Sequence, residues 1–232
     1  MTTASPNIQM LQSIARALAP LLHEVVFLGG ATVALYLQDA AAPEIRPTDD
    51  VDCLVELTSY AGYAALERRL RELGFANDTS PKAPVCRWLY EGIKVDVMPS
   101  DASVLGFTNA WYADGIKHKV PHTLPDGQRI FILPAPYFIA TKLVAFADRG
   151  AGDFRFSADI EDIIAILDGR TTLQAEVLAA PSDVRSYVAQ QFQAFLNDPD
   201  FLESVEGALA REGRRRQTRL FAVMRDCLAG RT

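Results

Sequence analysis

Three aspartates in two strand-like segments are the residues best suited to metal chemistry. In the segment RPTDDVDCLVEL, Asp50 and Asp52 are two residues apart in a strand pattern, so their side chains point to the same face. Asp96 lies on the polar side of a later alternating pattern, EGIKVDVMP. Like charges repel, and carboxylates cost free energy to desolvate, so such crowding calls for a cation. If the two strands are neighbours, the three carboxylates form an oxygen-rich cluster that suits Mg²⁺.

A glycine pair upstream of these aspartates adds a place for phosphate. Gly29 and Gly30 separate a short apolar strand pattern, EVVFL, from a helical pattern, ATVALYLQ. Backbone amides at the positive end of a helix bind phosphate groups. Two Mg²⁺ ions bridged by shared carboxylates can clamp the attacking and leaving oxygens in phosphoryl transfer. The order strand, Gly-Gly, helix, Asp-x-Asp strand and Asp strand therefore predicts phosphoryl-transfer chemistry, whereas each aspartate alone could be a solvated strand residue.

The surrounding elements predict an α+β fold in two parts. An amphipathic helical pattern covers residues 8–22, and a second helical pattern after the Asp-x-Asp strand ends at Gly74. The segment VCRWLYEGIKVDVMP predicts two strands joined at Glu91 and Gly92. From Pro134 onward the patterns are helical. We expect a small mixed sheet with flanking helices over residues 1–130, followed by a helical C-terminal part over residues 131–232.

The overall composition is that of an ordinary globular protein. The chain has 232 residues and a formal charge of −6, which does not by itself favour nucleic-acid binding. Its three isolated cysteines, Cys53, Cys86 and Cys227, predict small core residues rather than a disulfide framework or a zinc site. The sequence shows neither a secretory start nor a long uncharged apolar stretch. We therefore expect a cytoplasmic protein without a membrane partner.

These motifs together resemble those of a known superfamily. FLGG, then DDVD, then KVDVM are similar to the signature of the nucleotidyltransferase superfamily, which has the DNA polymerase beta-like fold. The stretches GGATVALYL, RPTDDVD, VLGFTNAWY and ATKLVAFADRGAGDFRFSADIEDI resemble its bacterial toxin-like branch, the AbiEii and MenT type. The resemblance covers roughly residues 25–167. Nineteen residues separate Gly30 from Asp50, more than in many members of the superfamily, which indicates a longer connector.

The resemblance implies a role for individual residues of this chain. It implies that Asp50, Asp52 and Asp96 are catalytic metal ligands, with two Mg²⁺ ions as the cofactor. It also implies that a group of nearby residues binds the nucleotide, with the first three at the triphosphate: Gly29, Gly30, Thr32, Lys142 and Asp159.

Several of these residues have a structural alternative. Arg46 either belongs to the nucleotide site or only positions the connector. Lys142, in a strongly apolar helix, could instead cover core surface with its aliphatic stem, and Asp159 could be a helix cap. The arginine-rich run over residues 211–219 is either a solvated helix face or a phosphate-contacting patch for an RNA acceptor.

The expected activity is Mg²⁺-dependent transfer of a nucleoside monophosphate from an NTP to a hydroxyl acceptor, with release of pyrophosphate. The toxin-like branch suggests a tRNA 3′ end or another RNA as the acceptor, and a cognate antitoxin as a further partner. A small molecule such as an antibiotic, or a protein hydroxyl, stays open as the acceptor. The alternative of another class is a non-catalytic nucleotide-binding module that works through partner contact.

Overall fold

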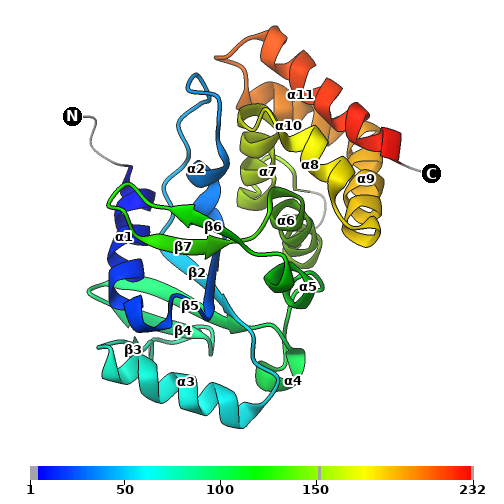
Figure 1. The fold of residues 1–232 in the computed structure, drawn as a ribbon. Helices are drawn as coiled ribbons and strands as arrows, with labels where there is room; N and C mark the ends of the chain where they lie inside the picture. The colour runs from blue at the N-terminus through cyan, green and yellow to red at the C-terminus, as the bar shows by residue number, and fades with distance from the viewer. Residues whose placement is uncertain (1–4, 151–152, 231–232) are drawn as a thin grey trace. The chain divides into compact units, whose positions relative to one another are not determined.

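The computed structural model describes residues 5–150 and 153–230, and in these ranges the chain has a mixed α/β fold (Figure 1). Its seven strands form one mixed sheet in the order β3-β4-β5-β2-β1-β7-β6. The strands are β1 (Val25–Leu28), β2 (Asp50–Val55), β3 (Ala76–Asn77), β4 (Arg87–Tyr90), β5 (Ile93–Pro99), β6 (Val120–Thr123) and β7 (Arg129–Ile132). The predicted combination of a mixed sheet and a following helical part is confirmed.

Helices precede and follow the strands along the chain, and they make up all the regular structure that is described after β7. Those before or between the strands are α1 (Pro6–Ala17), α2 (Val33–Tyr36), α3 (Tyr60–Glu72), α4 (Ala102–Leu105) and α5 (Tyr112–Lys117), together with the 3₁₀ turns η1 (Ala19–Leu21) and η2 (Gly30–Thr32). Those after β7 are α6 (Ala135–Gly150), α7 (Ala158–Gly169), α8 (Leu173–Ala179), α9 (Ser182–Leu196), α10 (Pro199–Ala208), α11 (Arg214–Cys227) and the turn η3 (Leu228–Gly230). Within the described ranges, no helix combines the length and the apolar character needed to cross a membrane.

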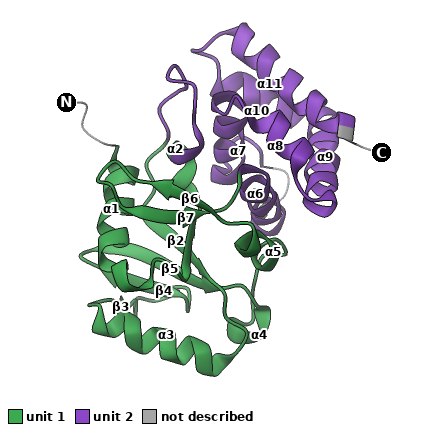
Figure 2. Ribbon diagram, in the orientation of Figure 1, with its two compact units in different colours: residues 1–34, 46–134 green, residues 35–45, 135–232 purple. Residues whose placement is uncertain are grey.

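The chain divides into two compact units, coloured separately in Figure 2. Unit 1 consists of Met1–Ala34 and Arg46–Pro134 and holds the sheet. Unit 2 consists of Leu35–Ile45 and Ala135–Thr232 and is helical. Compared with the expected division after residue 130, the second unit starts slightly later and also takes a short segment from the N-terminal half.

That short segment explains the long connector between Gly30 and Asp50. The backbone N–H groups of Gln38 and Asp39 donate to the carbonyl of Gly169, at 2.9 and 3.0 Å. They thus give a hydrogen-bond partner to a carbonyl at the end of α7, where the helix itself supplies none. Arg170 donates through Nη1 to the carbonyl of Tyr36 at 2.8 Å. A Cβ at Gly169 would lie 2.7 Å from Cδ2 of Leu37, so a larger residue there would force the Leu37 side chain to move. The additional residues of this connector therefore pack within unit 2.

Two helical patterns end earlier than the sequence predicts. The first helix stops at Ala17 and a 3₁₀ turn over Ala19–Leu21 follows, because Pro20 lacks the N–H that would continue an α-helix. After the glycine pair, a 3₁₀ turn and the single helical turn of α2 replace the predicted longer helix.

The centre of unit 1 is the strand β2. It pairs in parallel with β5 and antiparallel with β1, so it is covered on both edges. Val51 and Cys53, which alternate with the aspartates, are fully buried. Helix α1, whose apolar residues Leu11 and Ile14 are also fully buried, contacts this strand. Burial of one face of β2 thus holds the other face, with its carboxylates, at a defined place.

The hairpin β4–β5 is set by its two-residue turn. Glu91 and Gly92 have φ angles of 49° and 82°, which is the positive-φ pair of a type I′ turn. The predicted join between the two strands is at these residues. Because a two-residue turn determines the pairing of the flanking strands, Tyr90 pairs with Ile93 and, further along, Arg87 pairs with Asp96.

Candidate functional site

The three predicted carboxylates lie on one face of the sheet. In the parallel pair of β2 and β5, Asp52 is the register partner of Asp96, and Asp50 is that of Lys94. Register partners in a parallel pair point to the same side, and so do residues two apart in one strand. Asp50, Asp52 and Asp96 therefore share a face. Whether their carboxyl groups can converge around one ion stays a prediction.

Asp52 lies directly against the glycine turn. A Cβ added at Gly29 would be 1.8 Å from Oδ2 of Asp52 and 2.7 Å from its Cγ. Gly29 also has a φ of 76°, a conformation that L side chains rarely adopt. Both the backbone conformation and the neighbouring carboxylate therefore require glycine at position 29. The sequence suggested this turn as a phosphate site, and the structure places one of the aspartates beside it.

Thr32 helps to hold the glycine turn in this shape. It is fully buried, and its Oγ1 donates to the carbonyl of Gly29 at 2.9 Å, while its backbone N–H donates to the same oxygen at 3.1 Å. Gly30 is buried as well. The Thr32 hydroxyl thus contacts the turn itself, and its predicted role at a triphosphate stays a prediction.

Asp50 is oriented by residues that precede its strand. Thr48 Oγ1 donates to Oδ1 of Asp50 at 2.9 Å. The buried Asn7 of α1 holds that segment at two points: its Oδ1 accepts from the Thr48 N–H and its Nδ2 donates to the Arg46 carbonyl, each at 3.0 Å. Arg46 therefore takes part in positioning the connector through its backbone. Sequence reasoning missed Asn7, although a polar residue four before Leu11 on an apolar helix stripe is a usable signal.

Arg87, which sequence reasoning also missed, binds two of the three carboxylates. Its Nε and Nη2 donate to Oδ1 and Oδ2 of Asp96, both at 2.7 Å, in a two-pronged arrangement. Nη2 also lies 3.3 Å from Oδ2 of Asp50. The hydrogen bonds and the negative charge of Asp96, with a smaller contribution from Asp50, raise the pKa of the Arg87 guanidinium. The sequence did contain a signal for this pair. The two-residue turn at Glu91 and Gly92 sets the register of the hairpin, and this register places Arg87 opposite Asp96.

The cysteines near this face are ordinary core residues. Burial raises the pKa of the Cys53 thiol well above its usual value, and the charges of Asp52 and Asp96 act in the same direction. Burial is also the main reason that the pKa of Cys86 rises to about 12. Both side chains are therefore neutral thiols, as the sequence predicted for small core residues.

Lys142 and Asp159 lie in unit 2 and contact each other. The Nζ atom of Lys142 is 3.1 Å from Oδ1 of Asp159 and 2.6 Å from Oδ2 of Asp162, and all three side chains are buried. Arg149 also donates to Oδ1 of Asp159, at 3.1 Å. Because the ammonium is buried between carboxylates, Lys142 is not a lysine that only covers core surface with its stem while its charge stays in water.

The cap of helix α7 is Ser157 and not Asp159. The Ser157 hydroxyl accepts from the Ile160 N–H at 3.4 Å, which leaves Asp159 for the ion pairs described above. Asp162 was missed by sequence reasoning, although it follows Asp159 by three residues and so lies on the same side of the helix.

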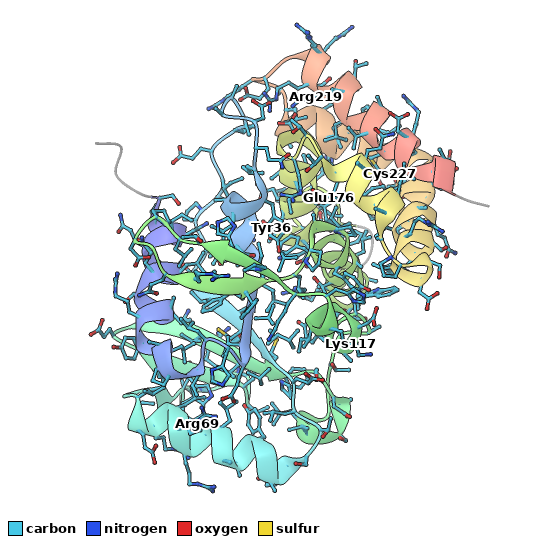
Figure 3. The ribbon with its side chains drawn as sticks, in the orientation of Figure 1. Tyr36, Arg69, Lys117, Glu176, Arg219 and Cys227 are labelled. Atoms are coloured by element: carbon cyan, nitrogen blue, oxygen red, sulfur yellow. The ribbon has the colours of Figure 1, made fainter. Side chains whose placement is uncertain are left out.

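The arginine-rich run divides into a structural and an exposed part. Arg216 donates from Nε to both oxygens of the fully buried Asp168 side chain at 2.9 Å, and Arg219 (Figure 3) pairs with Asp168 and with Asp39. These bonds attach α11 to α7 and to the connector segment of unit 2. The other three arginines of the run are exposed: Arg211, Arg214 and Arg215. The Arg219 side chain is itself 43% exposed, so a phosphate-contacting role stays a prediction for these four arginines and not for Arg216, which is 14% exposed.

The comparisons with known proteins do not place the chain in a family. No protein-family model matches it, and no curated protein matches it.

Proposed function

We propose that the protein is a Mg²⁺-dependent nucleotidyltransferase, which transfers a nucleoside monophosphate from an NTP to a hydroxyl acceptor. The observation that carries the proposal is the position of Asp52. This carboxylate lies against Gly29 of the strand–turn–helix and is the register partner of Asp96 on the neighbouring parallel strand. A glycine turn beside a carboxylate pair on one sheet face is a combination that suits phosphoryl transfer.

The side chains at this face fit Mg²⁺ by their chemistry. Carboxylate oxygens are the ligands that Mg²⁺ prefers, and Asp50, Asp52 and Asp96 would hold it. The Asp52 carboxylate fills the space that a side chain at position 29 would take. Among the residues that the structure describes, no three histidine, cysteine, aspartate or glutamate side chains are already grouped around a common ion position. In this conformation Arg87 provides the positive charge at Asp96 and Asp50.

In this proposal, separate residues of the chain contact the ion, the triphosphate and the acceptor hydroxyl. Bound Mg²⁺ would offset the negative charge of the phosphates and of the reacting oxygens. The turn at Gly29 and Gly30 brings backbone rather than side chain against Asp52, so this carboxylate can lie directly beside the turn that we assign to the triphosphate. Thr48 holds Asp50 in one orientation, and Asp96 is the carboxylate that we assign to the acceptor hydroxyl. Lys142 and Asp159 stay predicted nucleotide contacts on the strength of the resemblance alone.

An assay with labelled nucleotides tests the proposal. The protein is incubated with each labelled NTP, Mg²⁺ and total RNA, or with the protein alone, and the labelled product is identified by size. We expect transfer by the wild type and at least a hundredfold loss in Asp52→Asn, because the variant lacks a charge needed to hold the ion. The control is Asp49→Asn, which makes the same change at an exposed position just before β2.

Four results of these experiments have different meanings. A labelled RNA would identify the acceptor class that the toxin-like branch suggests, and a labelled protein band would identify a protein hydroxyl. Full activity in Asp52→Asn would exclude Asp52 as a metal ligand. Nucleotide binding without any labelled product, with RNA, protein or small hydroxyl compounds offered, would favour the non-catalytic nucleotide-binding module.

A further inference from the structure

Arg87 is a basic side chain in direct contact with two of the three aspartates of the proposed site. It donates two hydrogen bonds of 2.7 Å to Asp96 and one of 3.3 Å to Asp50. The Arg87 side chain is 19% exposed and that of Asp96 only 12%. A two-pronged bond between an arginine and a carboxylate in such partial burial is among the stronger polar contacts in proteins.

This contact uses the oxygens that a metal ion would need. Both oxygens of Asp96 accept from Arg87, and an oxygen of Asp50 accepts from the same guanidinium. A guanidinium stays positively charged at all ordinary pH values. A divalent ion on these oxygens would therefore meet a like charge a few ångströms away, where electrostatic repulsion is strong.

The backbone of Arg87 is held independently of this contact. Its N–H donates to the Pro84 carbonyl at 3.0 Å, its carbonyl accepts from the Asp78 N–H at 3.1 Å, and the residue pairs with β5 in the hairpin. The long side chain can thus leave the carboxylates by rotation about its own bonds, without a change in the strand.

We infer that Arg87 is an internal counter-ion that competes with the divalent metal for Asp96 and Asp50, and so sets the metal affinity of the site. Without a divalent ion, Arg87 keeps the crowded carboxylates together. When the ion binds, Arg87 gives up its bonds to them. This inference rests on the proposed function, because it takes the three aspartates as the metal ligands.

Titration of Mn²⁺ into the nucleotide-free protein tests the competition. Binding is followed by calorimetry in the wild type and in Arg87→Gln, which keeps an unbranched polar stem, shorter than that of arginine, and removes the charge. We expect Mn²⁺ to bind the variant at least tenfold more tightly, since the ion no longer has to displace the guanidinium. An equal or weaker affinity in Arg87→Gln overturns the inference.

The chain offers a matched control in the same unit. Arg69 on α3 (Figure 3) makes a similar two-pronged contact, with Nη1 and Nη2 at 2.9 and 2.8 Å from the two carboxylate oxygens of Glu24. Arg69→Gln therefore removes the same charge and a similar ion pair away from the aspartates. It should leave the Mn²⁺ affinity within twofold of the wild type, and a gain equal to that of Arg87→Gln would overturn the inference.

A second variant and the transfer assay complete the design. If Arg87→Gln does not fold, Arg87→Lys keeps the charge but loses the planar fork, and Mn²⁺ should bind it more tightly than the wild type by a smaller factor. Unchanged binding in that variant counts against the inference.

If the wild type transfers nucleotide while the Arg87 variants show unaltered metal affinity, only the inference fails. If neither the wild type nor the variants bind Mn²⁺, the inference and the metal-dependent function fail together.

Discussion

Replacement of Gly29 by alanine tests the geometry at the centre of the site without any assumption about activity. The new Cβ would lie 1.8 Å from Oδ2 of Asp52 and 3.0 Å from its Cβ, so the whole Asp52 side chain would have to move. Forcing a side chain into a packed site costs about 1–3 kcal/mol. With φ 76° and ψ −171°, position 29 lies in a backbone region essentially confined to glycine, which adds about 1–3 kcal/mol for another residue. We expect Gly29→Ala to lose about 2–6 kcal/mol of unfolding free energy.

The two contributions can be separated by urea denaturation in the presence of a chelator. Gly127→Ala has a similar φ of 88° but would meet nothing within 4 Å, so it should lose only the backbone contribution of about 1–2 kcal/mol. In the Asp52→Ala background, most of the contact is gone, and Gly29→Ala should cost less by about 1–3 kcal/mol. If Gly29→Ala is no more destabilising than Gly127→Ala, and does not depend on residue 52, the close approach of Asp52 to the turn is refuted.

Other substitutions test the electrostatics of the two units. Asp52→Asn should leave the thermal stability in chelator unchanged or higher, because repulsion among the carboxylates is relieved; a clear loss would contradict this. Lys142→Ala should lower the unfolding free energy by about 3–5 kcal/mol, since it leaves the buried carboxylates of Asp159 and Asp162 without their shared ammonium. Titration of NTP into folded Lys142→Ala then tests its predicted phosphate contact: a ten- to hundredfold weaker affinity supports that role, and equal affinities exclude it. Ser157→Ala should cost about 1 kcal/mol through loss of the α7 cap, and no cost in urea denaturation would show that the cap is not needed.

Local patterns of the sequence were sufficient for several parts of the site. Strand alternation places Asp50 and Asp52 on one face, because successive side chains of a strand point to opposite sides. The turn at Glu91 and Gly92 sets the hairpin register, because a two-residue connection leaves the strands few ways to pair. The glycine pair was recognisable as a turn between a strand and a helix. Each of these features depends on residues that are close in the chain.

Local sequence patterns could not identify the ion-pair partners of the charged residues. That β5 lies beside β2, so that Asp96 is opposite Asp52, depends on the order of strands in the sheet, which contacts between distant segments determine. The pairing of Arg87 with Asp96 follows from the turn, but its bond to Asp50 needs that same strand order.

In the helical unit, the hydrophobic pattern correctly predicted the helices, yet it could not assign the ion pairs between them. From the sequence, Lys142 was either a nucleotide contact or a cover for core surface, and only the packing of α6 against α7 brings it to Asp159 and Asp162. Arg216 belonged to an arginine run with no evident partner, and packing of α11 against α7 gives it the buried Asp168. Helical periodicity reports which face is buried, whereas the partner of a buried charge is set by the neighbouring helix, which lies far away in sequence.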